Sequence, residues 1–447
     1  MPPPAARATP ARGLARLSAR VAALRVCNFV TGGLTSVIVA RLLGPHDRGL
    51  WAVALLVGGL VALGSELGVS SAVLYFSRRD RGDMGVATSA GLLVLATSSL
   101  AVVGASLAAR LGLLPFVAAV PAGALFAALV VGVPANVTAV SRQALLASGD
   151  LLGAAWSQTL QSVSVLLLTG GALVFVGRDV VIVLLAYLAA QVLVTQATLF
   201  RLRRRGQIHR PRVSTMRSLL AYGVQAHVGT VALFLAYRFD ILLVNYFLGP
   251  AAAGVYSVAL TLSEALRAIP EAGQMAIYAR TAADGHLPVV GSMTRMILVA
   301  TGAGSVLVAG LNYWLVPLVF GVAFAPASLA FVALVPGLAG LAVSYTVSPL
   351  LVLRGRIRAT SASAVASLVL MIALDLVMIP RWGILGAAAA SSAAYCALAI
   401  LQVRAIQREG PLSLHQLLPG RGDVVMLVSE LGLRLGPWRL RLERPRS

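Results

Sequence analysis

The sequence predicts an all-α, polytopic membrane protein with twelve transmembrane helices in two six-helix bundles. Of its 447 residues, 59% are hydrophobic and only 11% are charged, whereas a soluble domain carries about 25% charged residues. The apolar runs have the length of about 20 residues that one bilayer crossing requires. They are too long and too uniformly apolar for barrel strands, so helices are the structure that satisfies the backbone in lipid.

Twelve apolar runs divide the chain into five regions. The regions are a basic N-terminus at 1–20, a first bundle at 21–200, a basic linker at 201–216, a second bundle at 217–404 and a basic tail from 405 to 447. The expected spans are 21–42, 50–77, 84–109, 113–147, 151–176, 180–200, 217–248, 253–279, 289–310, 314–352, 359–379 and 383–404. The first run continues without a small-residue cleavage motif, so we expect an uncleaved span and not a signal peptide.

Arginine placement predicts the orientation in the membrane. A net charge of +21 could indicate nucleic-acid binding, but the arginines lie between apolar runs and at both ends, so we expect no nucleic-acid partner. One set of alternate loops, with the termini, carries 29 arginines, and the opposite set carries five. The positive-inside rule then predicts a bacterial inner-membrane protein with both termini in the cytoplasm.

The two halves of the chain share a repeat with an offset of 205 residues. Leu43-Gly44-Pro45 followed by Gly49 returns as Leu248-Gly249-Pro250 followed by Gly254, and Glu66 returns as Glu271. Six helices per half make these parallel repeats, an arrangement typical of alternating-access transporters. The equivalent spans 113–147 and 314–352 are long and contain prolines, which indicates either helices that line a cavity or ordinary kinks.

Three segments resemble a known family. They are residues 40–49 (ARLLGPHDRG), 238–257 (RFDILLVNYFLGPAAAGVYS) and 379–388 (IPRWGILGAA), and they are similar to the polysaccharide-biosynthesis (Wzx-type) flippases of the multidrug/oligosaccharidyl-lipid/polysaccharide exporter superfamily. The similarity extends over about residues 14–405. It implies two six-helix lobes that face a central cavity, in the arrangement of multidrug exporters of that superfamily. It also implies export of oligosaccharides on a polyprenyl-diphosphate carrier, from the inner to the outer leaflet. The family commonly has Asn shortly before the proline at 380, where this chain has Asp375.

Charged residues inside the spans are candidates for the transport site. A charge at mid-bilayer costs about 2.5–3.5 kcal/mol and usually faces a partner or a wet cavity. Arg238 and Glu264 lie at similar depth on consecutive antiparallel spans, so a contact between them is one interpretation of their placement. Arg267 and Glu271 share a face with Glu264. These groups either fasten helices together or line a polar cavity.

The candidate ligands follow from the chemistry of an anionic sugar headgroup. A guanidinium can pair with phosphate through two hydrogen bonds, and amides can bind sugar hydroxyls, although most amides in spans join helices together. The phosphate candidates are Arg25, Arg238 and Arg267; the sugar candidates are Asn28, Gln158, Gln161, Gln191, Gln225 and His227; the carboxylates available for coupling to H+ or Na+ are Glu66, Asp240, Glu264, Glu271 and Asp375. Arg25 could alternatively snorkel to the membrane surface.

Several other functions remain as alternatives. A multidrug or cation antiporter of the same superfamily would favour an acidic, aromatic-lined cavity, and a peptidoglycan-precursor flippase would typically carry two extra helices. A membrane glycosyltransferase or polymerase would need a large external loop, which this chain lacks, and a passive scaffold would not explain the repeat. We therefore expect a transporter without enzymatic activity, cofactor or metal site; its partners would be the bilayer, the lipid-linked substrate and polysaccharide-assembly proteins.

Overall fold

The computed structural model describes residues 11–79, 85–284, 288–408 and 420, and all regular structure in these ranges is helical. Contacts divide the chain between His227 and Val228 into an N-terminal unit and a C-terminal unit. The first helices are α1 (Ala11–Glu66), α2 (Val69–Arg79), α3 (Val86–Arg110), η1 (Pro115–Val117), α4 (Ala122–Ala147), α5 (Leu151–Phe175) and α6 (Val180–Arg204). They are followed by α7 (Val213–Leu248), α8 (Pro250–Asp284), α9 (Pro288–Phe320), η2 (Val322–Phe324), α10 (Ala327–Leu353), α11 (Ile357–Trp382) and α12 (Ile384–Gln407).

Helix α1 contains the first two membrane crossings. Gly44 interrupts it with a φ of 74°, and Arg48 donates a hydrogen bond of 2.9 Å to Ser36 Oγ. Residues twelve apart in a straight helix are about 18 Å apart, so this contact shows that the chain reverses direction. Ten helices in the described part of the chain, counting α1 once, are long and apolar enough to span a bilayer. Helix α8 falls outside that set because it carries several charges. When α1 is counted as two crossings and α8 is added, the helical class and the number of crossings agree with the prediction.

The second expected span, 50–77, is not continuous. Leu67 and Gly68 have φ values of 52° and 71°, so α1 ends there and α2 begins at Val69. Gly68 lies so close to the backbone of Gly223 that a Cβ atom would collide with its carbonyl oxygen. Glu66 accepts a hydrogen bond of 2.9 Å from the backbone N–H of Ser70 and so stabilises the start of α2. Hydropathy could not reveal this break because apolar residues lie on both sides of it.

The prolines of the two long spans do not all interrupt helices. Pro121 and Pro326, related by the offset of 205, directly precede α4 and α10, and each follows a short 3-10 turn. The predicted spans 113–147 and 314–352 are therefore too long at their beginnings, and α9 extends to Phe320 instead of ending near residue 310. Pro134, Pro336 and Pro349 do lie inside helices.

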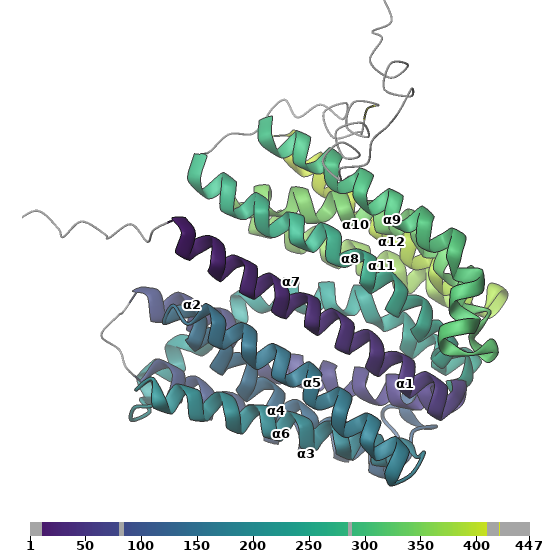
Figure 1. Cartoon of the computed structure of the whole chain (residues 1–447), viewed down its shortest axis with the longest axis horizontal. Helices are drawn as coiled ribbons and strands as arrows, with labels where there is room; N and C mark the ends of the chain where they lie inside the picture. Colours follow the sequence, from purple (N-terminus) through teal and green to yellow (C-terminus); the bar gives the residue numbers. More distant parts are fainter. Residues whose placement is uncertain (1–10, 80–84, 285–287, 409–419, 421–447) are drawn as a thin grey trace, which may run out of the picture. The chain divides into compact units, whose positions relative to one another are not determined.

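The repeat is visible in the geometry of each unit. Gly44 and Gly249 both have positive φ, 74° and 83°, at the equivalent turns, where glycine avoids a steric penalty. Helix α4 packs against α1, α3, α5 and α6, and its counterpart α10 packs against α8, α9, α11 and α12 (Figure 1). In each unit, one central helix thus packs against at least four others. Between α6 and α7, only residues 205–212 of the predicted linker lie outside helices.

Exposed aromatic side chains lie near helix ends. Trp314 and Trp382 are more than half exposed, near the ends of α9 and α11. Tryptophans at such positions are typical of the boundary between lipid and water. Together with the many exposed Leu and Val side chains on the helices, they identify the outer surface as a membrane-facing one.

Candidate charged site of the C-terminal unit

An ion pair joins α7 to α8 inside the C-terminal unit. Arg238 Nη2 lies 2.5 Å from Glu264 Oε1, and each side chain is 35% exposed. The turn at Gly249 makes the two helices antiparallel neighbours, which brings side chains of α7 and α8 within reach of one another. The predicted pairing of Arg238 with Glu264 is confirmed. Partial exposure leaves both groups accessible to another charged partner.

A second pair continues along the same face of α8. Arg267 Nε lies 3.0 Å from Glu271 Oε1, and the hydroxyl of Tyr345 donates a hydrogen bond of 3.1 Å to the same oxygen. The guanidinium of Arg267 lies 4.9 Å from the ring centroid of Tyr237, within the range of a cation–π interaction. Two arginines are therefore balanced by two glutamates, and tyrosines surround one of the arginines.

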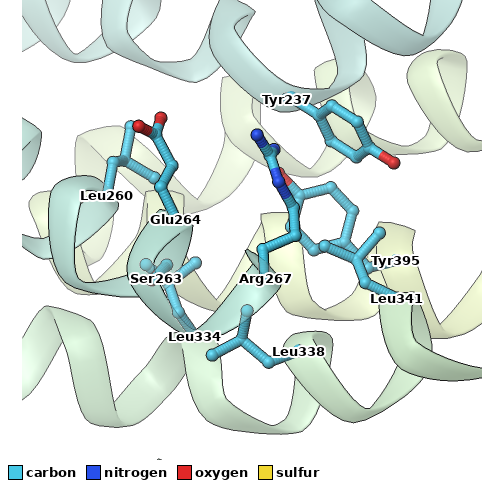
Figure 2. Close-up of a pocket in the computed structure, with 9 residues that line it drawn as sticks. All are labelled: Tyr237, Leu260, Ser263, Glu264, Arg267, Leu334, Leu338, Leu341 and Tyr395. Atoms are coloured by element: carbon cyan, nitrogen blue, oxygen red, sulfur yellow. The ribbon is translucent and has the colours of Figure 1, made fainter. Parts of the chain in front are cut away.

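Arg267 and Glu264 also line one pocket (Figure 2), together with Tyr237, Leu260, Ser263, Leu334, Leu338, Leu341 and Tyr395. Figure 2 shows the guanidinium beside the ring of Tyr237 and the Glu264 carboxylate pointing away from it. The pocket volume is about 20 Å³, which is room for about one water molecule. The site in this conformation is too small to hold a sugar.

The aromatic members of this site were not predicted from the sequence. Tyr237 and Tyr395 pack edge to face with ring centroids 5.6 Å apart, and Tyr345 comes from α10. Tyr237 is more than 100 residues from both Tyr345 and Tyr395 in the sequence, which hides the three from any local pattern. One signal was available, because Tyr237 directly precedes Arg238 in a chain with only 6% aromatic residues.

Two buried carboxylates form a second cluster in the same unit. Asp240 is completely buried; it accepts hydrogen bonds from the Tyr256 hydroxyl at 2.6 Å, the Ser391 hydroxyl at 3.0 Å and the backbone N–H of Ile241 at 2.8 Å. Asp375 of α11 is equally buried, and neither of its oxygens has a hydrogen-bond partner among the described residues. The two side chains are within electrostatic reach of each other.

Buried carboxylates without enough donors are costly unless a proton or a cation neutralises them. The cluster therefore has the chemistry of a cation site: two carboxylates and two hydroxyls from α7, α8, α11 and α12. Among the described residues, no group of three or more His, Cys, Asp or Glu side chains could hold a metal ion. The groups of the cluster itself offer oxygen atoms only, which suit a proton or a singly charged ion.

The amide candidates of the N-terminal unit mostly serve helix packing. Gln161 Nε2 donates to Gln191 Oε1 at 2.9 Å, and Gln191 is almost fully buried next to Thr138. Thr138 in turn lies 2.8 Å from the hydroxyl of Thr195. This network joins α4, α5 and α6, so the structure favours the packing alternative for Gln161 and Gln191.

The remaining candidates are dispersed. Arg25 is exposed on α1 and Gln158 is exposed on α5. Asn28 Oδ1 and His227 Nε2 are buried without a hydrogen-bond partner in the described part of the chain, while the side chain of Gln225 lies outside that part. Glu66 stabilises the start of α2. Within the C-terminal unit, the structure gathers Arg238, Arg267, Glu264 and Glu271 into one site.

Comparison with known families identifies the chain. The profile of the family described as "Polysaccharide biosynthesis protein" matches residues 38–272, which is more than half of the sequence. The chain belongs to this family. No curated protein matches the sequence.

Solved structures share the fold of this polysaccharide biosynthesis protein. The lipid II flippase MurJ in an inward closed conformation has a TM-score of 0.73 at 13% identity, covering 94% of this chain and 95% of that one. An inward-facing multidrug transporter of the MATE family has a TM-score of 0.63 at 15% identity, with coverages of 86% and 96%. A transporter from Pyrococcus furiosus, described as having a binding pocket of reversed polarity, has a TM-score of 0.52 at 14% identity, with coverages of 85% and 95%. The chain therefore has the fold of these transporters, two of which are described as members of the MOP superfamily, and this agrees with the fold that the resemblance implied.

Proposed function

We propose that this protein is a flippase that moves polyprenyl-diphosphate-linked oligosaccharides from the inner to the outer leaflet by alternating access, for cell-surface polysaccharide biosynthesis. Two ion pairs carry the proposal: Arg238 with Glu264, and Arg267 with Glu271. Both are partly exposed and lie in membrane-spanning helices of a chain that belongs to the polysaccharide biosynthesis family. Intramembrane charges at this depth are expensive and usually functional. The likeness in fold to a lipid II flippase supports a lipid-linked cargo.

Arg238 and Arg267 are the proposed phosphate ligands. Both are paired with carboxylates of α8. While no substrate is bound, each glutamate neutralises its arginine and so lowers the free-energy cost of the charge in the membrane. A diphosphate offers acceptor oxygens to the same guanidinium edges and carries more charge than one carboxylate. We therefore expect the headgroup to displace Glu264 and Glu271, with Tyr237, Tyr345 and Tyr395 offering rings and hydroxyls to the sugar.

Asp240 and Asp375 are the proposed coupling carboxylates. Their burial, and the absence of hydrogen-bond partners for Asp375 among the described residues, favour uptake of one H+ or Na+, and Tyr256 and Ser391 complete an oxygen-rich site. Binding and release of the ion would alter the packing of α11 and α12 against α7, the helix that also carries Arg238. The ion gradient could in this way drive the transport cycle.

The proposed setting is the bacterial inner membrane with both termini in the cytoplasm, where the arginine-rich ends and loops would lie. The proposed partners are the lipid-linked oligosaccharide and the assembly proteins that elongate the exported unit. A periplasm-specific reporter enzyme fused after residue 447 should remain inactive. Activity of that fusion would overturn the orientation.

Leaflet exchange in proteoliposomes tests the proposed transport directly. A fluorescent polyprenyl-diphosphate oligosaccharide should become accessible to a membrane-impermeant quencher faster with the wild-type protein than with Arg238→Ala. Arg178→Ala, which removes an exposed arginine from the loop before α6, is the matched control and should exchange at the wild-type rate. Equal exchange rates in wild-type and protein-free vesicles would contradict the proposed function.

One observation favours a second candidate, a multidrug or cation antiporter. Tyrosines and glutamates gather around the site, and aromatic, acidic surroundings bind organic cations. The same proteoliposomes distinguish the two functions when loaded with a fluorescent organic cation. Cation efflux driven by an ion gradient, together with no exchange of the lipid-linked sugar, would replace the flippase proposal by the antiporter.

A further inference from the structure

A groove near one end of the N-terminal unit is not used by the proposed transport site. It has a volume of about 450 Å³ and is lined by Arg20, Ala23 and Leu24 of α1, by Leu152 and Trp156 of α5, and by Arg201 of α6. Ligand pockets in proteins commonly have volumes of about 300–1,000 Å³. The groove therefore has the size of a binding site, and its lining combines cations with apolar side chains.

One cation of this groove, Arg201, is oriented by the buried Asp150. Arg201 donates from Nε to Asp150 Oδ2 at 2.8 Å and from Nη2 to Oδ1 at 3.0 Å. Asp150 also accepts from the backbone N–H of Gly153 at 2.9 Å, so its position is fixed by the start of α5. A guanidinium has five N–H donors, and two of those on Arg201 are used here. The remaining donors are available to a further acceptor.

The local charge is positive. Arg205 Nη2 lies 3.3 Å from the same carboxylate, so Asp150 is shared by two arginines. Arg20 and Arg201 line the groove, and Arg205 shares Asp150 with Arg201, so this region holds three arginines and one aspartate, an excess of two positive charges. An acceptor that carries negative charge complements this excess.

The groove lies where a lipid headgroup would be. Asp150 directly precedes α5, and Arg201 is in the last turn of α6, so both are at helix ends. Trp156 is 56% exposed and lies six residues into α5, about 9 Å further into the membrane. Tryptophan prefers the boundary between headgroups and acyl chains, and Leu24 and Leu152 provide an apolar surface beside it.

We propose that this groove binds an anionic phospholipid of the surrounding bilayer, with its phosphate between Arg20 and Arg201 and an acyl chain along Leu24, Leu152 and Trp156. Basic pockets between transmembrane helices are known to bind such headgroups. The bound lipid would link α1 to α5 and α6 at the membrane surface. This inference concerns the bulk lipid and is independent of the proposed transport substrate.

Quenching of Trp156 by brominated lipids tests the proposal. In nanodiscs, a variant that keeps Trp156 as the single tryptophan should be quenched more by brominated phosphatidylglycerol than by brominated phosphatidylcholine at the same mole fraction. Arg20→Gln should lower this preference about fivefold, the effect of one basic residue at an anionic surface. Arg203→Gln, an exposed arginine on the same turn of α6 that does not line the groove, should keep the preference.

A further variant and a competition experiment complete the test. Ala23→Glu, which adds a negative charge to the groove, should also remove the preference, and it does so without altering either arginine. Equal quenching by the two lipids in the parent protein, or an unchanged preference in Arg20→Gln, would overturn the proposal. Recovery of Trp156 fluorescence on adding a polyprenyl-diphosphate sugar at a small fraction of the phosphatidylglycerol concentration would also overturn it, because the groove would then take the transported lipid.

Discussion

The two units keep the same turns but differ in their charges. With the offset of 205, Arg238 corresponds to Gly33, Glu264 to Gly59 and Arg267 to Ala62. For every member of the two ion pairs except Glu271, the equivalent residue of the N-terminal repeat is thus a glycine or an alanine. The repeat preserved the glycine turn and the proline before the central helix, because these determine the fold. The charged site belongs to the C-terminal unit only.

Packing explains why the N-terminal unit lacks such a site. A Cβ atom on Gly132 would lie 2.8 Å from the Cβ of Ala62, so α1 and α4 are in close contact at the level where the other unit has Arg267. Asn136 strengthens this contact by donating to the carbonyl oxygen of Ala62 at 2.8 Å. Small residues permit such close helix packing in membranes. The comparison shows that, at equivalent positions, the N-terminal unit has close helix packing through small residues and the C-terminal unit has charged side chains.

The largest effect is expected from reversing one charge of the C-terminal unit. Arg238→Glu leaves two carboxylates facing each other in the membrane, and an uncompensated charge there costs about 2.5–3.5 kcal/mol, so lipid-linked sugar exchange should fall about 100-fold. The double variant Arg238→Glu with Glu264→Arg should recover most of the exchange rate. Wild-type exchange by the single variant would remove the pair from the mechanism.

A smaller and more specific effect on the exchange rate is expected from neutralising the buried carboxylates of Asp240 and Asp375. Asp240→Asn and Asp375→Asn should each lower the ion-driven exchange rate about tenfold, because one coupling carboxylate is lost, and should abolish its dependence on the H+ or Na+ gradient. Asp179→Asn is the control, since that exposed aspartate only stabilises the start of α6. Exchange that keeps its gradient dependence in both variants would show that the ion binds elsewhere.

The tight packing of the N-terminal unit can be tested by stability. Gly58→Ala would place a Cβ against the carbonyl oxygen of Ala128, and we expect a loss of about 1–3 kcal/mol in the free energy of unfolding. Gly33→Ala should change it by less than about 0.5 kcal/mol, because no atom lies within 4 Å of the added Cβ. Thermal unfolding in detergent measures both, and equal shifts would contradict the difference between the two positions.

The smallest effect concerns Asp150. The hydrogen bond from Arg201 holds the pKa of Asp150 below its ordinary value, so the contact stabilises the fold above the pKa of an unfolded aspartate. This stabilisation is lost as the pH falls through the lowered pKa. Asp150→Asn should destabilise the protein by about 1 kcal/mol or less at neutral pH, because Arg201 is partly exposed. Thermal unfolding should show this difference shrinking in acid; a constant difference would contradict the assignment.

The sequence predicted those features that depend on residues close together in the chain. The pairing of Arg238 with Glu264 follows from a turn only a few residues long, and the repeat follows from shared Gly and Pro residues. The association of Asp240 with Asp375 could not be predicted, because it requires the packing of α7 against α11 and α12. The break at Leu67 and Gly68 was equally hidden, since hydropathy does not register a change of backbone conformation.

The most direct test of the central claim is photocrosslinking from the C-terminal site. p-Azidophenylalanine at position 237 should crosslink to a labelled polyprenyl-diphosphate oligosaccharide, and Arg267→Ala should reduce this crosslinking. The same amino acid at position 246, an exposed tyrosine near the end of α7, is the matched control and should crosslink much less to the sugar. Equal labelling from both positions, unaffected by Arg267→Ala, would contradict a substrate site around the ion pairs of the C-terminal unit.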